Sequence, residues 1–263
     1  MGLMNSFDLQ RESGRIILFL KETFQQAEFS QAVIAVSGGV DSSVSLALTV
    51  QALGEENVFP ILMPYGALNT QGVLDGMELI NQLHIPLFHV IRIDVKPAVD
   101  AIIGKEAFDM GNVRKGNVMA RVRMTYLFDQ AKKRTALVVG TENKSEHMLG
   151  YFTRFGDEAS DVEPIIHLYK TQVIELASHL PIPQSILIKP PSAGLWPEQT
   201  DEKDFGFSYQ DADRILSLLY DEKKTAKETV EAGFDRLLVE KIQLRVNQNS
   251  FKHKTPYTFF LPR

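Results

Sequence analysis

The chain has 263 residues, with 28 Lys+Arg against 33 Asp+Glu, so its formal net charge is −5. Hydrophobic residues make up 44% and charged residues 23%, which are the proportions of a globular protein rather than of a disordered or coiled-coil chain. The negative balance argues against a nucleic-acid-binding protein, which usually has a basic surface. We therefore expect no nucleic acid among the partners.

Cysteine is absent from the chain. This excludes disulfides, cysteine zinc sites, iron–sulfur clusters and a thiol nucleophile. No apolar run reaches membrane-spanning length, and Asp8, Arg11 and Glu12 interrupt any signal pattern near the N-terminus. We expect a cytoplasmic protein with no membrane partner.

Apolar patterning predicts strands that alternate with helices along the first half of the chain. The expected elements are, in order, a helix over residues 11–26, a strand over 32–36, a helix over 42–53, a strand over 58–63, a helix over 69–83, a strand over 87–93, a helical stretch over 95–103, a helix over 117–132 and a strand over 136–139. This order is typical of βαβ units. We expect an α/β fold: a doubly wound, Rossmann-like parallel sheet of about five strands, with helices on both faces.

The second half is less regular. We expect a loop over 151–161, a helix over 170–180, an irregular loop over 187–200, helices over 208–220 and 234–249, and an extended tail over 251–263. The loop over 187–200 is rich in Pro and Gly and long enough to be a candidate lid. Because no linker or internal repeat separates the parts, we expect a single domain over 1–263.

The first predicted strand runs into a glycine-rich turn and then a helix. The turn reads Ser37, Gly38, Gly39, Val40, Asp41 and Ser42. The glycines allow successive N–H groups to point at one phosphate, and the helix N-terminus adds positive potential there. A carboxylate beside phosphates is repulsive unless a cation lies between them, so Asp41 indicates Mg²⁺.

This turn resembles the SGGxDS loop of the N-type ATP pyrophosphatases, whose fold is adenine nucleotide alpha hydrolase-like. Those enzymes activate a carbonyl or carboxyl group by adenylation and release pyrophosphate. An alternative interpretation is the nucleophile elbow of a serine hydrolase, with Ser37 as nucleophile and His167, His179 or His253 as its base. The elbow interpretation gives Asp41 no role, and it would follow an unusually early strand.

Later motifs narrow the resemblance. They are G-T-E-N-K-S-E at 140–146, G-Y-F-T-R-F-G-D at 150–157, D-V-E-P-I at 161–165, L-Y-K-T-Q-V at 168–173, P-S-A-G-L-W-P-E-Q-T-D-E at 191–202 and H-K at 253–254. In this order, and over nearly the whole chain, they resemble the ammonia-dependent NAD synthetases. That resemblance implies amidation of deamido-NAD to NAD. The nicotinate carboxylate attacks ATP, pyrophosphate leaves an acyl-adenylate, and ammonia then displaces AMP.

The resemblance also implies roles for individual residues. The ATP phosphates would contact Ser37, Gly38, Gly39, Val40, Asp41 and Ser42, and Thr141, Lys170 and Ser192 would complete the ATP site. Asp41 and Glu146 match the Mg²⁺ ligands, and Asp41 and Lys170 would be the catalytic residues. Deamido-NAD would contact Arg121, Arg154, Asp161, His253 and Lys254.

Two departures from the family pattern affect the substrate contacts. Relatives usually have Lys where Arg154 stands, and they usually read G-D-G-G where this chain has Asp157 followed by Glu158, Ala159 and Ser160. The length and the absence of cysteine leave no room for a glutaminase domain, so ammonia itself is the expected nitrogen donor. The family is typically homodimeric, and we expect a homodimer. Another N-type amide ligase and an adenine-nucleotide sensor remain the alternatives.

Overall fold

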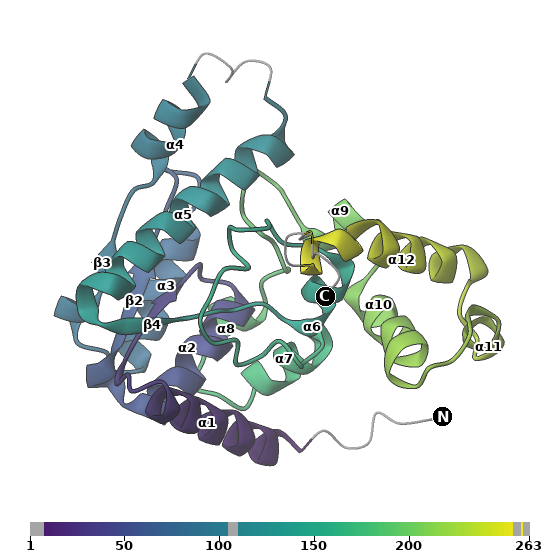
Figure 1. The fold of residues 1–263 in the computed structure, drawn as a ribbon, viewed down its shortest axis with the longest axis horizontal. Helices are drawn as coiled ribbons and strands as arrows, with labels where there is room; N and C mark the ends of the chain where they lie inside the picture. The colour runs from purple at the N-terminus through teal and green to yellow at the C-terminus, as the bar shows by residue number, and fades with distance from the viewer. Residues whose placement is uncertain (1–7, 105–109, 255–258, 260–263) are drawn as a thin grey trace.

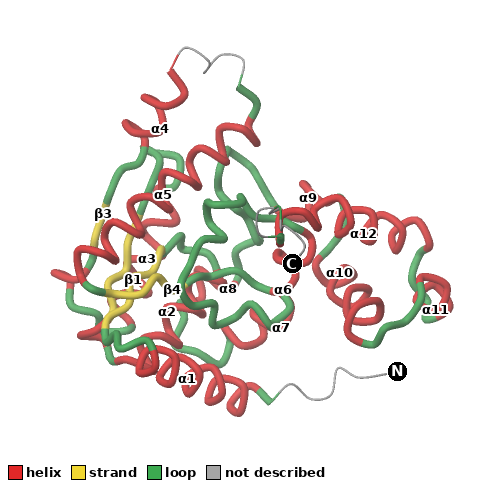
Figure 2. The backbone as a smooth tube through the Cα atoms, in the orientation of Figure 1, coloured by secondary structure: helices red, strands yellow, loops and turns green. Residues whose placement is uncertain are grey.

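The structure is a computed structural model that describes residues 8–104, 110–254 and 259. Its centre is a parallel sheet in the order β3-β2-β1-β4. The strands are β1 (Gln31–Ala35), β2 (Val58–Leu62), β3 (Ile91–Arg92) and β4 (Ala136–Val139) (Figures 1 and 2). The chain leaves β1 toward β2 on one side and returns to β4 on the other. Ligands bind at such a switch point in an open parallel sheet, beyond the carboxyl ends of the strands.

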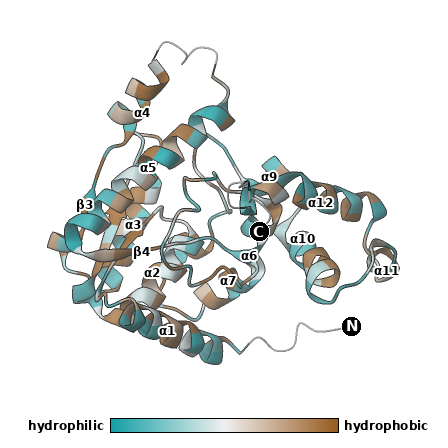
Figure 3. Ribbon diagram, in the orientation of Figure 1, coloured by the Kyte–Doolittle hydropathy of each residue, from teal (hydrophilic) through white to brown (hydrophobic). Residues whose placement is uncertain are grey.

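Alternate residues of β1 point to opposite faces, and each face is covered by helices. Ile34 packs into a core with α1 (Leu9–Gln26), α2 (Val40–Leu53), α3 (Thr70–Gln82) and α7 (Lys170–Ala177). Val33 packs into a second core with α4 (Lys96–Ile103) and α5 (Asn112–Arg134). The expectation of a doubly wound parallel sheet is therefore confirmed. Figure 3 shows the hydrophobic and hydrophilic bands of the outer helix α1.

A third core lies among the helices of the second half, to the right of the sheet in Figure 1. These helices are α6 (Lys144–Leu149), α9 (Asp201–Phe205), α10 (Tyr209–Leu216), α11 (Ala226–Glu231) and α12 (Arg236–Asn249), whereas α8 (Gln184–Leu187) packs into the first core through Ile186. Leu149 of α6, Tyr209 of α10 and Ile242 of α12 are all buried there. The contact between α6 and α12 brings the C-terminal helix to the carboxyl end of β4. In the described part of the chain, no helix is long and apolar enough to cross a membrane.

Several predicted boundaries differ from the structure. The strand expected over 87–93 shrinks to β3, because residues 87–89 form a 3₁₀ turn after Pro86 in which His89 N donates to the Pro86 carbonyl. A fifth strand is reduced to a single bridge between Val139 and Val162. The start of the tail, 250–253, is a 3₁₀ turn rather than extended chain, and most of the remaining tail lies outside the described residues.

The turn after β1 is held tightly against α3. Gly38 has φ +77°, and a Cβ on it would lie 2.3 Å from the carbonyl oxygen of Gly72. A Cβ on Gly72 would in turn lie 2.4 Å from the carbonyl oxygen of Ser37. Both neighbours are backbone atoms, so neither can yield by a side-chain rotation. This contact fixes the height of the glycine-rich turn over the sheet.

We expect Gly72→Ala to lower the free energy of unfolding by about 1–3 kcal/mol, because the added methyl forces α3 and the turn apart. The matched control is Gly14→Ala on α1, where a Cβ meets nothing within 4 Å. That change should leave stability equal or raise it by up to about 1 kcal/mol, through helix propensity. Urea unfolding of both variants measures the difference. Equal stabilities would show that the close approach imposes no constraint.

Candidate active site

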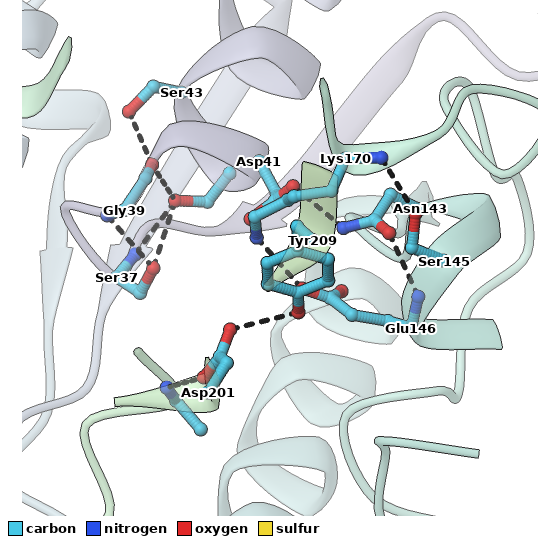
Figure 4. Close-up of polar contacts among 12 residues, drawn as sticks. Ser37, Gly39, Asp41, Ser43, Asn143, Ser145, Glu146, Lys170, Asp201 and Tyr209 are labelled. Carbon is cyan, nitrogen blue, oxygen red and sulfur yellow. Dashed lines mark hydrogen bonds and ion pairs between the residues drawn. The ribbon is translucent and has the colours of Figure 1, made fainter. Parts of the chain in front are cut away.

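The turn over residues 37–42 is closed by its own hydroxyl groups (Figure 4). Ser37 Oγ lies 3.0 Å from Ser42 Oγ and accepts from Gly39 N at 3.2 Å. Ser42 Oγ and Ser43 Oγ both donate to the Gly39 carbonyl, at 3.1 and 2.7 Å. These hydrogen bonds order the turn without a ligand. Its last three residues already belong to α2, which starts at Val40. That is the arrangement in which helix N–H groups bind phosphate.

A buried ammonium group lies beside this turn. Lys170, the first residue of α7, is 2% exposed. Its Nζ donates to Asp41 Oδ2 at 2.6 Å and to Glu146 Oε1 at 2.9 Å. Asn143 Nδ2 donates to the other Asp41 oxygen at 2.9 Å. Side chains from the first turns of three helices, α2, α6 and α7, thus meet in one polar group, as Figure 4 shows.

Acidic side chains outnumber the one lysine in this group. Asp201 adds a third carboxylate, and its Oδ2 accepts from the Tyr209 hydroxyl at 3.0 Å. Burial raises the pKa of Glu146 to about 8; the negative charge of Asp41 acts in the same direction, and Lys170 opposes it. Burial alone would lower the pKa of Lys170, but Asp41 and Glu146 raise it above its usual range. Lys170 is therefore charged, and Asp41, Glu146 and Asp201 are the acidic side chains around it.

The donor set fits a magnesium ion that is completed by substrate. Within the described residues, no group of three or more His, Asp or Glu side chains could hold a metal by itself. Asp41 and Glu146 are nevertheless close enough to share the Lys170 ammonium. Mg²⁺ is usually held by one or two carboxylates together with phosphate oxygens and waters, so two protein carboxylates are the expected complement.

A cavity of about 1000 Å³ opens over the carboxyl edge of the sheet. It is large enough for a nucleotide. Its lining includes the turn over 37–42, Thr141, Glu146, Lys170 and Ser192. All predicted ATP-site residues and both predicted magnesium ligands therefore face one space.

The loop over 188–200 forms one wall of the cavity. Gly194 accepts a hydrogen bond from Asn69 Nδ2 at 2.8 Å, and Asn69 Oδ1 accepts from Arg123 Nη2 at 3.3 Å. The side chain of Leu195 meets Gly116 of α5, where a Cβ would lie 2.9 Å away. The loop thus spans from α8 to α5 across the cavity. This is where a lid would lie, and its movement stays a prediction.

The comparisons with known proteins agree with this geometry. A family model described as NAD synthase matches residues 12–256. The chain belongs to the NAD synthase family. It is 40% identical over 255 residues to an NH(3)-dependent NAD(+) synthetase of Fusobacterium nucleatum, covering 96% of this chain and 97% of the relative. The protein is accordingly a ligase that forms NAD, with ATP as co-substrate.

Solved structures of this family superpose over nearly the whole chain. An NMN synthetase from Francisella tularensis gives a TM-score of 0.85 at 34% identity, covering 97% of this chain and all of that one. An NH3-dependent NAD synthetase from Campylobacter jejuni gives 0.80 at 30% identity, with the same coverages. The adenine nucleotide alpha hydrolase-like fold is therefore confirmed for this NAD synthase.

The predicted dinucleotide contacts lie outside the cavity lining. Arg121 donates from Nε and Nη2 to the Arg154 carbonyl, at 3.3 and 3.2 Å. Arg154 Nη2 donates to the Lys254 carbonyl at 2.5 Å. Asp161 Oδ2 accepts from Val138 N at 2.8 Å, and the ring of His253 packs 4.2 Å from that of His147. Four of these residues form a group next to the cavity, and Asp161 stands apart at the edge of β4.

The serine-hydrolase interpretation finds no support in the geometry. In the described part of the chain, the hydrogen bonds of Ser37 Oγ go to Ser42 and Gly39, and none goes to a histidine. His167 Nε2 lies 2.8 Å from Glu12 Oε1, at the outer helix α1.

Sequence reasoning missed several residues that build the site. They are Asn143, which holds Asp41; Arg123, which holds Asn69; Lys189, which donates to the Gly38 carbonyl and to Asp75; and the pair Asp201 and Tyr209. Burial lowers the pKa of Arg123, and the charge of Asp157 partly offsets this. Asn143 had a signal, because it follows a strand and precedes a helix, where Asn is favoured as a cap. Lys189 and Tyr209 had none, since their partners lie far away in the sequence.

A partly buried acid, Glu163, lies behind the site. Glu163 Oε1 accepts from Ser160 Oγ at 2.7 Å, and its Oε2 accepts from Glu142 N at 3.2 Å. Burial raises the pKa of Glu163 to about 8, and the charge of Glu142 contributes. A Cβ on Gly140 would lie 1.8 Å from Glu163 Oε1, so the carboxyl is packed against the backbone of the strand end.

This shift predicts a pH-dependent stability. The folded pKa of Glu163 is above the unfolded one, so the folded state holds a proton that the unfolded state releases between about pH 4.5 and 8. The contribution of Glu163 to stability should therefore fall as pH rises through this window, by at most about 1.4 kcal/mol per pH unit. Glu163→Gln, which mimics the protonated acid, should flatten the slope. Urea unfolding at pH 5, 6, 7 and 8 measures it, and parallel slopes for the two proteins would contradict the assignment.

Proposed function

We propose that the protein converts deamido-NAD to NAD, by adenylating the nicotinate carboxylate with ATP and displacing AMP with ammonia. The observation that carries this proposal is the convergence of the 37–42 turn and the buried Lys170, Asp41 and Glu146 group in one cavity. A phosphate cradle and a cation–carboxylate group in contact are what phosphoryl chemistry requires. The similarity to the NH(3)-dependent NAD(+) synthetase from Fusobacterium nucleatum supports NAD as the product and ammonia as the nitrogen donor.

The phosphates of ATP would lie in the turn. Its main-chain N–H groups and the hydroxyls of Ser37 and Ser42 supply the donors, and the start of α2 supplies positive potential. Lys170 Nζ has three N–H donors. Two of them donate to Asp41 and Glu146, and the third is available for a phosphate oxygen. Thr141 and Ser192 lie on the same cavity wall and would complete the nucleotide contacts.

Asp41 and Glu146 would hold Mg²⁺ together with the phosphates. Bound there, the ion would neutralise phosphate charge that otherwise repels an attacking carboxylate. Lys170 contributes a fixed positive charge at the same place, in a setting from which most water is excluded.

The reaction balances in two steps. A nicotinate oxygen forms a bond to the α-phosphorus of ATP while the bond to pyrophosphate breaks, giving an acyl-adenylate. Ammonia then bonds to the activated carbonyl carbon and gives up a proton, and AMP leaves. Because water competes with ammonia for the adenylate, the loop over 188–200 would serve to exclude it.

The outer residues Arg121, Arg154, Asp161, His253 and Lys254 would bind deamido-NAD. Arginine presents a permanent, forked charge that suits the pyrophosphate of a dinucleotide. These residues lie on the exposed surface beside the cavity, and a second copy of the chain would enclose them. We therefore propose a homodimer of single-domain chains that acts in the cytoplasm, where ATP is made.

The decisive experiment measures NAD and pyrophosphate together. Purified protein receives ATP, Mg²⁺ and deamido-NAD, with ammonium or glutamine as nitrogen donor. We expect equal amounts of NAD and pyrophosphate with ammonium, and little of either with glutamine. Pyrophosphate or NAD absent in both arms, from folded protein that binds ATP, would return the function to another N-type amide ligase or to a nucleotide sensor.

A second acceptor belongs in the same assay, because one of the solved structures reported above is an NMN synthetase. Nicotinate mononucleotide carries the same carboxylate as deamido-NAD and lacks the adenylate half. We expect kcat/KM for deamido-NAD to exceed that for nicotinate mononucleotide. A higher kcat/KM for nicotinate mononucleotide would make that compound the acceptor, and the two proposed reaction steps would stay the same.

We expect Asp41→Ala to lower kcat by at least about 100-fold, because it removes a magnesium ligand and leaves Lys170 with fewer counter-charges. The matched control is Asp129→Ala on the exposed face of α5, which should keep wild-type kcat. Steady-state pyrophosphate release measures both variants, and circular dichroism establishes that they fold. More than about a tenth of wild-type activity in folded Asp41→Ala would overturn the metal assignment.

A further inference from the structure

The last described turn of the chain is tied to the rim of the cavity. Lys252 Nζ donates to the carbonyls of Gly150 and Phe152, at 2.6 and 2.9 Å. The neighbouring Lys254 carbonyl accepts from Arg154. Gly150, Phe152 and Lys252 all line the cavity. The two residues that the resemblance assigns to deamido-NAD, His253 and Lys254, are thereby carried to its edge.

The direction of the His253 side chain is set by two other rings. The ring centroid of His147 lies 4.2 Å away with planes tilted by 51°, and that of Phe152 lies 5.4 Å away. His147 and Phe152 are themselves stacked, with centroids 6.0 Å apart and planes 15° apart. His253 therefore rests against a surface of two nearly parallel rings. Such contacts restrict a side chain that is otherwise exposed on a terminal turn.

His147 is in turn held from the interior. Its Nδ1 lies 3.3 Å from Oε2 of Glu142, which is only 5% exposed. Glu142 is fixed because its own N–H donates to Glu163, and because it directly follows Thr141 in the cavity wall. One edge of the His147 imidazole thus contacts the buried carboxyl group of Glu142, and one face contacts His253. His147 itself does not line the cavity; it contacts Phe152, which does, and His253, which lies at the rim.

We propose that His147 is a positioning residue that sets the orientation of His253 for binding of the acceptor dinucleotide. The proposal rests on the proposed function, since it takes deamido-NAD as the acceptor. It assigns to His147 an effect on acceptor binding and none on ATP, because the residues that His147 touches, Glu142, Phe152 and His253, are not among the predicted ATP contacts.

The test compares two replacements of the same side chain. His147→Ala removes the ring and should raise the KM for deamido-NAD about three- to tenfold, with the KM for ATP and kcat within about twofold of wild type. His147→Phe keeps a ring but not the hydrogen bond, and should keep the KM for deamido-NAD within about twofold. His179→Ala, which removes an exposed histidine at the end of α7, is the matched control and should equal wild type.

A double-mutant cycle separates positioning from general loss of structure. If His147 acts through His253, then His147→Ala should add less than about twofold to the KM of a His253→Ala protein. Additive effects, equal rises in both substrate KM values, or an unchanged KM in His147→Ala would each overturn the proposal. Should His147→Ala fail to fold, His147→Leu keeps the bulk without the ring and carries the same expectations.

The outcomes also separate this proposal from the proposed function. Wild-type protein that makes no NAD from deamido-NAD overturns the proposed function, and the role of His147 with it. Active wild-type protein whose acceptor KM does not respond to His147→Ala overturns only the role of His147.

Discussion

The site depends on one buried ammonium group shared by carboxylates from separate elements. Lys170 enters from the start of α7, and its Nζ contacts Asp41 of α2 and Glu146 of α6. A lysine that is 2% exposed would be very costly without such partners, and the carboxylates would repel each other without the lysine. Each charge is therefore tolerated only because the others are present. The polar group fixes the positions of α6 and α7 relative to the 37–42 turn. That turn also packs closely on α3 through glycine contacts.

The position of this group follows from sheet topology. β1 and β4 are neighbours in space although more than a hundred residues separate them, so the turns that follow both strands meet. Gly140 and Thr141, directly after β4, face the same cavity as Ser37 and Gly38, directly after β1. The ordered hydroxyls of the turn and the two carboxyl groups thus lie side by side, which is the set of donors and acceptors that a polyphosphate with its cation would need.

The sequence predicted the parts of this arrangement that local chemistry decides. The turn after β1, the strand at 136–139 and the positions of Thr141, Glu146 and Lys170 could be read from short motifs, because residue type and position in a βαβ unit go together there. Local patterning failed where a distant contact or a single proline decides the outcome. Residues 87–93 have strand-forming composition, yet Pro86 starts a turn and leaves two residues for the edge strand. Tyr209 and Asp201 join the site only because α9 and α10 pack on α6, which no local pattern records.

The C-terminal helix α12 connects the part of the site that contains Glu146 with the residues around His253. α12 packs on α6, the helix that carries Glu146, and Arg245 and Asn249 of α12 reach the cavity lining. An added Cβ at Gly150 would lie 2.2 Å from Cβ of Asn249, so the end of α6 is seated directly on this helix. Lys252 and His253 both lie in the turn that directly follows α12. Glu146 on α6 and the turn that carries Lys252 and His253 are therefore connected through the contact between α6 and α12. Side-chain changes around His253 can thus alter contacts at the rim of the cavity without moving Glu146 or the 37–42 turn.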